Sequence, residues 1–277
     1  MTHNYLPALL LSGFFFFGKT SSLPAQSQSV YQVAQGTWNG SVKNGKFECW
    51  LKTNGGKEGY SISKVIFDLR ELDPQPARGN GTYKIVREAG TLILKGKLDE
   101  NSGSGQFTLT PDASFISVLK GRGIEVTDVQ LPPQLFFANI NTAYLNFLGE
   151  NGYAVHSEGP LLTLATQGMG YSWLSDFLKG LKDKGYEGVS MDKLIEMRIQ
   201  GVDIAYIDQL ERLGYKHIPL DEIIDLKIHD VTAGYIASLQ QKGYAKCTLD
   251  QYKSMRDNNF TGDERINVQV KVQVKVN

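Results

Sequence analysis

Cysteine is nearly absent from this sequence. The 277 residues contain two, Cys49 and Cys247, so the chain cannot be a small scaffold held together by disulfides. Its 41% hydrophobic and 10% aromatic residues suffice for a packed core without such bridges. A disulfide between the two cysteines is one alternative. Two independent buried thiols are the favoured one, because the residues lie in different halves of the chain on patterns that need no bridge.

An excess of charge of either sign is also missing. The chain has 29 Lys and Arg residues against 29 Asp and Glu residues, and no cluster of basic residues stands out. Nucleic-acid binding depends on such clusters to neutralise phosphates. We therefore expect no nucleic-acid partner.

Long apolar runs are missing as well, apart from one short segment. Residues 6–18, with phenylalanines at 14–17, are too few for a membrane span of about 20 residues. Small and polar residues follow, and Ala25 fits a cleavage position. We predict a signal peptide at residues 1–25 and an exported chain, periplasmic or secreted, that has no membrane span.

Motifs for catalysis and metal binding are absent too. The sequence has no HExxH, no GxSxG and no glycine-rich phosphate loop. SxxK occurs three times without its companion SDN or KTG motifs, at Ser61/Lys64, Ser117/Lys120 and Ser190/Lys193. We predict no catalytic residue, no metal and no cofactor, and hence a protein that is not an enzyme.

The first half of the chain shows an alternation of apolar and polar residues. Residues 47–51, 65–69 and 92–98 follow this period of two, which is typical of strands. Turn signals stand between such stretches: Asn44-Gly45, Asn54-Gly55-Gly56, Asn80-Gly81, Ala89-Gly90 and residues 102–105. About six strands are therefore predicted in residues 32–110, as an antiparallel β sandwich or half-barrel. Trp38 and Trp50 either line a ligand cavity in it or, as we favour, are core or edge aromatics.

The second half carries an internal repeat of 29 residues. Gly-Tyr pairs begin at 185, 214 and 243, and the same template fits Gly152-Tyr153 and Gly123-Ile124. The step from Gly152 to Gly185 is 33 residues, so that module has a four-residue insertion. We predict an α-helical array of about five 29-residue helix-pair repeats in residues 111–262, whose natural use is a contact surface.

Each module is predicted to contain two short helices. N-cap residues begin the first helices at Asp112, Asn141, Asp203 and Thr232 and the second helices near Ser190, Pro219 and Thr248. The repeated glycine fits the left-handed position of a Schellman turn, which folds the next residue back against the helix. We interpret the Gly-Tyr pairs as helix punctuation and not as ligand contacts.

The last residues differ again. In residues 263–277, Val and Ile alternate with Asn, Gln and Lys, which predicts a C-terminal β-strand tail. The strand either joins the edge of the first sheet, as we favour, or stays exposed for a partner.

One irregular segment coincides with the insertion in the repeat. Residues 168–173 place Met169, Tyr171 and Trp173 beside flexible glycines. Aromatic anchors are common at protein interfaces, so these three are the candidate partner-binding residues. The favoured alternative is packing across a widened gap in the array.

Four short stretches of the sequence resemble those of a known family, in the same order along the chain: residues 87–91 (Arg-Glu-Ala-Gly-Thr), 103–112, 197–202 and 226–231. With them, residues 60–262 resemble the extracytoplasmic β plus helical-repeat region associated with BlaR/MecR-type metallopeptidase sensors of bacteria. The chain has neither the membrane helices nor the zinc-binding motif of those sensors. The resemblance therefore implies a stand-alone accessory or sensor module of the cell envelope without the peptidase.

These features together predict an exported, non-enzymatic protein-interaction or sensor-accessory module of the bacterial cell envelope. The helical repeat is its docking surface, and a protein partner is expected in the envelope. The alternative is a small-ligand or lipid-binding protein with a cavity in the β domain.

Overall fold

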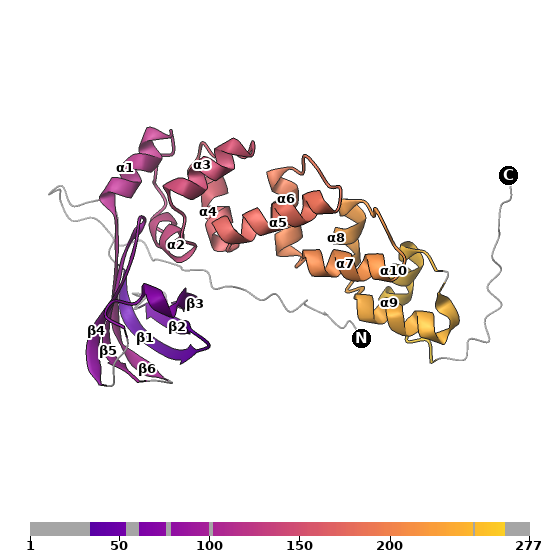
Figure 1. The fold of residues 1–277 in the computed structure, drawn as a ribbon, viewed down its shortest axis with the longest axis horizontal. Helices are drawn as coiled ribbons and strands as arrows, with labels where there is room; N and C mark the ends of the chain where they lie inside the picture. The colour runs from indigo at the N-terminus through magenta and orange to yellow at the C-terminus, as the bar shows by residue number, and fades with distance from the viewer. Residues whose placement is uncertain (1–33, 54–60, 76–78, 100–101, 246, 264–277) are drawn as a thin grey trace, which may run out of the picture. The chain divides into compact units, whose positions relative to one another are not determined.

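The computed structural model describes residues 34–53, 61–75, 79–99, 102–245 and 247–263. In this part of the chain an antiparallel six-stranded sheet, curled as a half-barrel, is followed by ten α-helices (Figure 1). The chain divides into two compact units, residues 1–175 and 176–277. The predicted signal peptide and C-terminal strand lie outside the described residues.

The sheet consists of two three-stranded meanders. The first strand of the first meander pairs with the last strand of the second. The strands of the sheet are β1 (Ala34–Lys43), β2 (Lys46–Thr53), β3 (Ser61–Asp68), β4 (Asn80–Arg87), β5 (Gly90–Leu98) and β6 (Gly103–Pro111). Their order is β3-β2-β1-β6-β5-β4, and every neighbouring pair is antiparallel. Of the two predicted arrangements, the sheet has the half-barrel form. A 3-10 turn, η1 (Leu69–Glu71), follows β3 where the alternation had predicted continued strand.

Glycines in the first half have two different roles. Asn44 and Gly45 have φ of 52° and 70°, as the predicted hairpin turn requires. Gly81 and Gly105, predicted as turn residues, instead lie inside β4 and β6. A Cβ at Gly105 would lie 1.9 Å from a carbonyl oxygen of β5. Gly105 therefore permits close backbone packing, which gives the same sequence signal as a turn. At Gly81 a Cβ would instead lie 2.9 Å from the ring of Tyr83.

Trp38 accounts for one glycine of these strands, Gly103. The register places Trp38 opposite Gly105, which in turn lies opposite Gly96. The fully buried indole N–H donates to the carbonyl of Lys95 at 3.3 Å, and a Cβ at Gly103 would lie 2.7 Å from the ring. The ring thus occupies space that larger side chains would fill. The rest of this inner face is equally closed by Phe47, Cys49, Leu51, Phe67, Ile85, Leu92, Leu94 and Leu98.

Trp50 lies on the opposite, outer face of the sheet. It pairs with Asn39 on β1 and is partly exposed, and the Lys64 ammonium lies 5.1 Å from its ring centroid. Neither tryptophan lines an inner cavity, which agrees with the interpretation of Trp38 as a core residue and Trp50 as a surface residue.

The helices begin at the N-caps that the sequence indicates. They are α1 (Ala113–Gly121), α2 (Leu131–Phe137), α3 (Thr142–Glu150), α4 (Glu158–Thr166), α5 (Tyr171–Asp183), α6 (Met191–Ile199), α7 (Ile204–Arg212), α8 (Leu220–Ile228), α9 (Ala233–Leu239) and α10 (Leu249–Asp257). Side-chain oxygens accept backbone N–H groups at Asp112, Asn141, Ser190, Asp203, Thr232 and Thr248. Pro219 occupies its N-cap without a side-chain bond.

The helix ends also follow the predicted turn. Gly123, Gly152, Gly185, Gly214 and Gly243 have φ between 80° and 101°. After Gly214, for example, the Tyr215 N–H donates to the Leu210 carbonyl at 3.1 Å. The second helices end in the same left-handed turn at Asn139, Gly168, Gly201, Asp230 and Asn259. Three of these residues are not glycine, so the sequence pattern did not reveal this second set.

The four-residue insertion lengthens a helix and not a loop. Helix α5 has 13 residues, whereas α3, α6, α7 and α8 have nine each. Four residues add about one helical turn. The segment at 168–173 is therefore an ordinary junction between α4 and α5.

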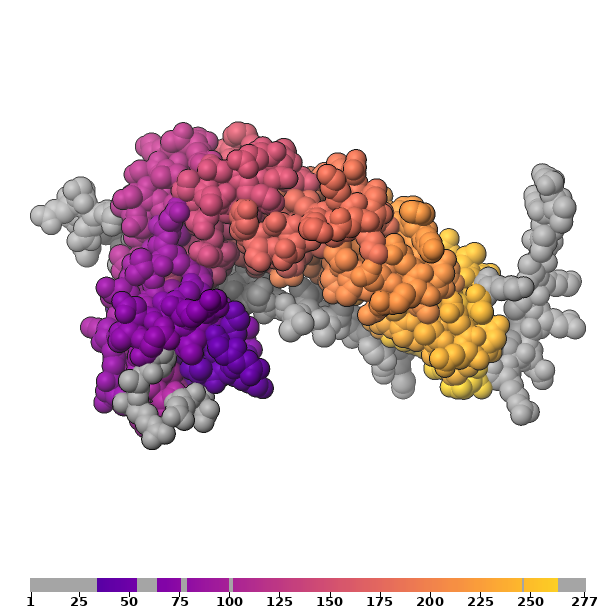
Figure 2. Space-filling model, viewed as in Figure 1, coloured from indigo at the N-terminus to yellow at the C-terminus, as the bar shows by residue number. Residues whose placement is uncertain are grey.

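Arg87 joins the sheet to the helices of the first unit. Its Nε and Nη2 donate to the two carboxylate oxygens of Glu71 at 2.9 and 3.0 Å. Its Nη1 donates to the carbonyls of Phe136 and Phe137 at 2.7 and 3.1 Å, where α2 ends. The guanidinium also lies 5.1 Å from the ring of Phe67. Helix α2 is thereby held against the sheet (Figure 1). In the space-filling view of the first unit, the magenta helical part packs directly on the purple strands (Figure 2).

Glu88, the next residue, makes a second connection. Its carboxylate accepts from the N–H and the hydroxyl of Thr142 at 2.9 and 2.7 Å, at the start of α3. The carbonyl of Ala89 accepts from the N–H of Asp112 at 3.1 Å. The phrase at residues 87–91 therefore has a structural role at the junction of strands and helices.

Candidate functional site

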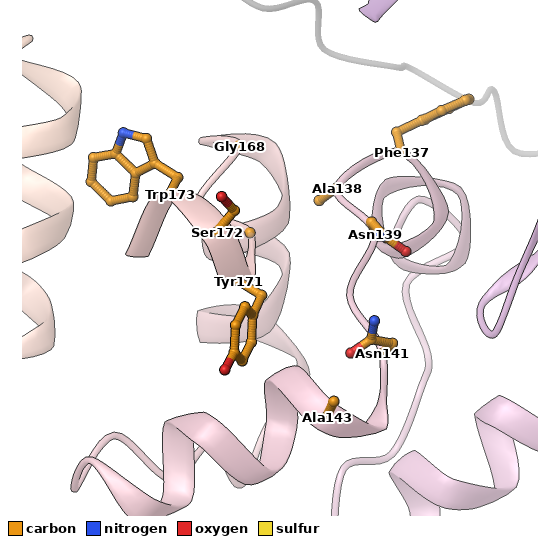
Figure 3. A pocket seen from close by; sticks show the side chains of 10 residues that line it. Phe137, Ala138, Asn139, Asn141, Ala143, Gly168, Tyr171, Ser172 and Trp173 are labelled. Carbon is orange, nitrogen blue, oxygen red and sulfur yellow. The ribbon is translucent and has the colours of Figure 1, made fainter. Parts of the chain in front are cut away.

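The three candidate partner-binding residues have different environments. Met169 is fully buried, and its carbonyl accepts from the Tyr144 hydroxyl at 2.5 Å. The structure corrects the expectation for this residue, because a side chain inside the core cannot contact a partner. Trp173 is half-buried, and its ring extends away from the loop that precedes α3 (Figure 3).

Tyr171 is the exposed member of the set. It begins α5, and 46% of the residue's surface is accessible. Its ring centroid lies 4.9 Å from that of Phe147 and 6.5 Å from that of Tyr144. Two other aromatic rings thus lie beside the Tyr171 ring, while nearly half of the residue stays accessible.

Tyr171 lines a pocket within the first unit. The pocket has a volume of about 510 Å³ and lies between the α2–α3 loop and the start of α5 (Figure 3). Its lining consists of Phe137, Ala138, Asn139, Asn141, Ala143, Gly168, Gly170, Tyr171, Ser172 and Trp173. None of these residues carries a charge.

The backbone brings the two sides of the pocket together. A Cβ at Gly170 would lie 2.8 Å from the carbonyl oxygen of Ala138, so only glycine allows this approach. Asn139 ends α2 with φ of 53°. Asn141 uses its Oδ1 to accept from the Tyr144 N–H at 2.9 Å, which leaves its amide N–H groups for other partners. No sequence motif announced this pocket, because its residues come from two separate loops.

Tyrosine hydroxyls hold the helices together at recurring positions. Tyr206 donates to the carbonyl of Val231 at 2.6 Å and Tyr235 to that of Phe260 at 2.8 Å, both 25 residues further along. The bond from Tyr144 to Met169 has the same separation in the first unit. Burial raises the pKa of Tyr144 and of Tyr206, since a phenolate would lose its hydration there.

A second recurring bond links successive helix pairs. Tyr186 donates to the carbonyl of Ile218 at 2.6 Å and Tyr215 to that of Cys247 at 2.7 Å, both 32 residues further along. The tyrosines of the Gly-Tyr pairs are thus structural residues, as the sequence indicates.

Two isoleucines form a second candidate surface in the second unit. Ile199 and Ile228 are the last residues of α6 and α8, lie 29 positions apart and are exposed. The residue before Ile228, Lys227, places its ammonium 4.3 Å from the ring centroid of Tyr206. The matching phrases at 197–199 and 226–228 were the only sequence signal for this pair.

Among the described residues, no group of three or more His, Cys, Asp or Glu side chains is arranged to hold a metal. Cys49 and Cys247 are free thiols. Cys49 is buried, as the favoured alternative expects, whereas Cys247 is only partly buried. Burial raises the pKa of Cys49, and to a smaller extent that of Cys247.

A second pocket lies on the outer face of the sheet. Its volume is about 280 Å³, and it is lined mainly by polar side chains: Gln35, Thr37, Lys95, Gln106 and Thr108, with Ile93 among them. The inner face is filled by its own side chains. The small-ligand or lipid-binding alternative in the β domain stays a prediction.

Comparisons with protein-family models, curated proteins and solved structures find no match to the chain. The resemblance to BlaR/MecR-type sensors therefore stays a prediction. No helix in the described ranges has both the length and the apolar character to cross a membrane.

Proposed function

We propose that this protein is an exported, non-enzymatic protein-interaction or sensor-accessory module of the bacterial cell envelope. The helices would supply the docking surface. The recurrence of one local structure along the chain carries this proposal: the same capped start, the same left-handed turn and the same tyrosine bond. Chains built in this way use their extended helical surfaces to bind other proteins.

The recurring contacts support a count of five helix pairs. The first helices start at 113, 142, 171, 204 and 233, so the steps are 29 residues except for 33 after α5. Tyrosine-to-carbonyl bonds of equal separation occur in three of the pairs. The same proposal includes the predicted C-terminal strand, which would add to the edge of the first sheet.

Ile199 and Ile228 are our candidates for the contact surface of the second unit. Single exposed isoleucines are ordinary on protein surfaces. Here the same exposed residue recurs at the same position of successive helix pairs, so one partner could contact both. Apolar side chains at such positions contribute to binding when the partner shields them from water.

The experiment compares two matched surface changes in a pull-down from the protein's own cell envelope, with residues 26–277 as bait. One bait carries Ile199→Glu and Ile228→Glu. The control bait carries Ile66→Glu on β3, because Ile66 is 54% accessible and Ile228 is 56% accessible. The control thus matches the single change Ile228→Glu in residue type and closely in exposure, while the surface differs, so Ile228→Glu alone is tested beside the double variant.

We expect a stoichiometric partner that the helix variant loses by at least about tenfold and the control keeps. Loss with the control alone would place docking on the sheet and contradict the proposal. Recovery of a bound lipid or small molecule without protein would favour the β-domain alternative.

A further inference from the structure

The pocket beside Tyr171 has the properties of a site for an uncharged ligand. Its volume of about 510 Å³ lies within the range of roughly 300–1,000 Å³ that is common for small-molecule sites. No Lys, Arg, Asp or Glu lines it. Phosphate and carboxylate ligands usually depend on such charges, so the lining favours a neutral occupant.

The polar groups of the lining both donate and accept hydrogen bonds. These are the amides of Asn139 and Asn141 and the hydroxyl of Ser172. Asn141 has one bond committed to the N–H of Tyr144. An entirely apolar ligand would cover these groups and leave them without partners, which is unfavourable. The occupant must therefore carry several hydrogen-bonding groups of its own.

Tyr171 adds one flat apolar surface to these groups. The ring centroid of Phe147 lies 4.9 Å from that of Tyr171, and nearly half of Tyr171 is accessible. The rings of Phe137 and Trp173 extend away from the space between the loops (Figure 3). The lining thus combines one partly accessible aromatic ring with three polar side chains that can donate and accept.

We propose that this pocket binds a neutral saccharide. The C–H face of a pyranose ring would lie on Tyr171, and its hydroxyls would bond to Asn139, Asn141 and Ser172. Each sugar hydroxyl donates and accepts at one atom, which matches these groups. A docked peptide would use several apolar subsites for its side chains, and the two outward rings do not supply them.

The test titrates the full chain with four neutral trisaccharides: maltotriose, cellotriose, mannotriose and triacetylchitotriose. Saturation-transfer NMR identifies the protons that touch the protein, and calorimetry measures the Kd. We expect one sugar to bind with a Kd of about 0.1–5 mM. Inorganic phosphate should not compete with it. A capped, uncharged tetrapeptide of Gly, Ser and Val tests the peptide alternative.

Three variants locate the binding. Tyr171→Ala removes the aromatic ring and should weaken binding by about tenfold. Ala143→Phe fills the pocket from an exposed position, so it should abolish binding without disturbing the core. Trp50→Ala, which removes an exposed aromatic on the outer sheet face, should leave the Kd unchanged.

Three results would overturn the proposal. The first is that none of the four sugars binds saturably. The second is that binding survives both Tyr171→Ala and Ala143→Phe. The third is that the tetrapeptide binds in a Tyr171-dependent manner while no sugar binds. Because this site lies in the first unit, the outcome does not depend on docking through Ile199 and Ile228.

Discussion

Two arginines of the first unit allow a direct test of how burial changes the contribution of an arginine–carboxylate pair to stability. Arg87 meets Glu71 through two hydrogen bonds of 2.9 and 3.0 Å. Arg70 meets Asp68 through two of 2.9 Å. Both are arginine–carboxylate pairs, but the Arg87 side chain is 9% accessible and the Arg70 side chain is 90% accessible. We predict that Arg87→Ala destabilises the first unit and that Arg70→Ala has no measurable effect.

The magnitude follows from what Arg87 leaves behind. Its removal takes the donor from two carbonyls at the end of α2 and the partner from Glu71. Removing one partner of a buried ion pair costs about 3–5 kcal/mol. Glu71 is partly exposed and can regain water, so we expect about 2–4 kcal/mol for Arg87→Ala. Exposed pairs contribute little because water and salt already screen them.

Tryptophan fluorescence in urea measures this effect without dissecting the chain. All three tryptophans, Trp38, Trp50 and Trp173, lie in the first unit. The unfolding midpoint of Arg87→Ala should fall well below those of the parent and of Arg70→Ala. If both variants unfold at the same urea concentration, the argument from burial is refuted.

Four further predictions concern single residues. Iodoacetamide should modify Cys247 at least about tenfold faster than Cys49 in the folded chain, as followed by mass spectrometry, because burial raises the pKa of Cys49 further; faster modification of Cys49 would contradict this. Because burial raises the pKa of Cys49, the stability of the folded chain should fall as the pH rises past the ordinary thiol pKa of 9.0. Cys49→Ala should reduce this loss of stability at high pH. Gly105→Ala, whose Cβ would meet a carbonyl, should cost more than about 2 kcal/mol, whereas Gly149→Ala in α3, with nothing within 4 Å, should stabilise by up to about 1 kcal/mol; equal urea midpoints would disprove the difference. Tyr206→Phe should lower the stability of the second unit by about 1–2 kcal/mol, seen as faster amide exchange in α7 and α8, and unchanged exchange would show that the hydroxyl contributes nothing.

Local chemistry explains which parts of the fold the sequence predicts. An N-cap at Asp203 or a left-handed glycine at Gly214 depends on a few neighbouring residues, and both occur where expected. The capping box of Thr248 and Gln251 is likewise complete. Such features need no knowledge of the tertiary structure.

Distant contacts explain where the sequence misleads. Gly105 carries the signal of a turn, yet it is glycine because the backbone of β5 approaches it closely. Met169 carries the signal of an exposed anchor, yet its burial depends on helices that precede it in the chain. The pocket beside Tyr171 arises from loops about 30 residues apart, so no short motif could announce it.

The tyrosine hydrogen bonds of the second unit also bear on how local unfolding of one helix pair would affect its neighbours. Tyr206 and Tyr235 each tie the start of a helix pair to the carbonyl just beyond its end, so each pair is closed by a contact of its own. Loss of order in one pair then removes support only from its immediate neighbours. The last pair, α9 and α10, could open and close while α7 and α8 keep their fold. Cooperativity in this unit is therefore graded along the chain, and a partner that binds two adjacent pairs would join them into a single unfolding step.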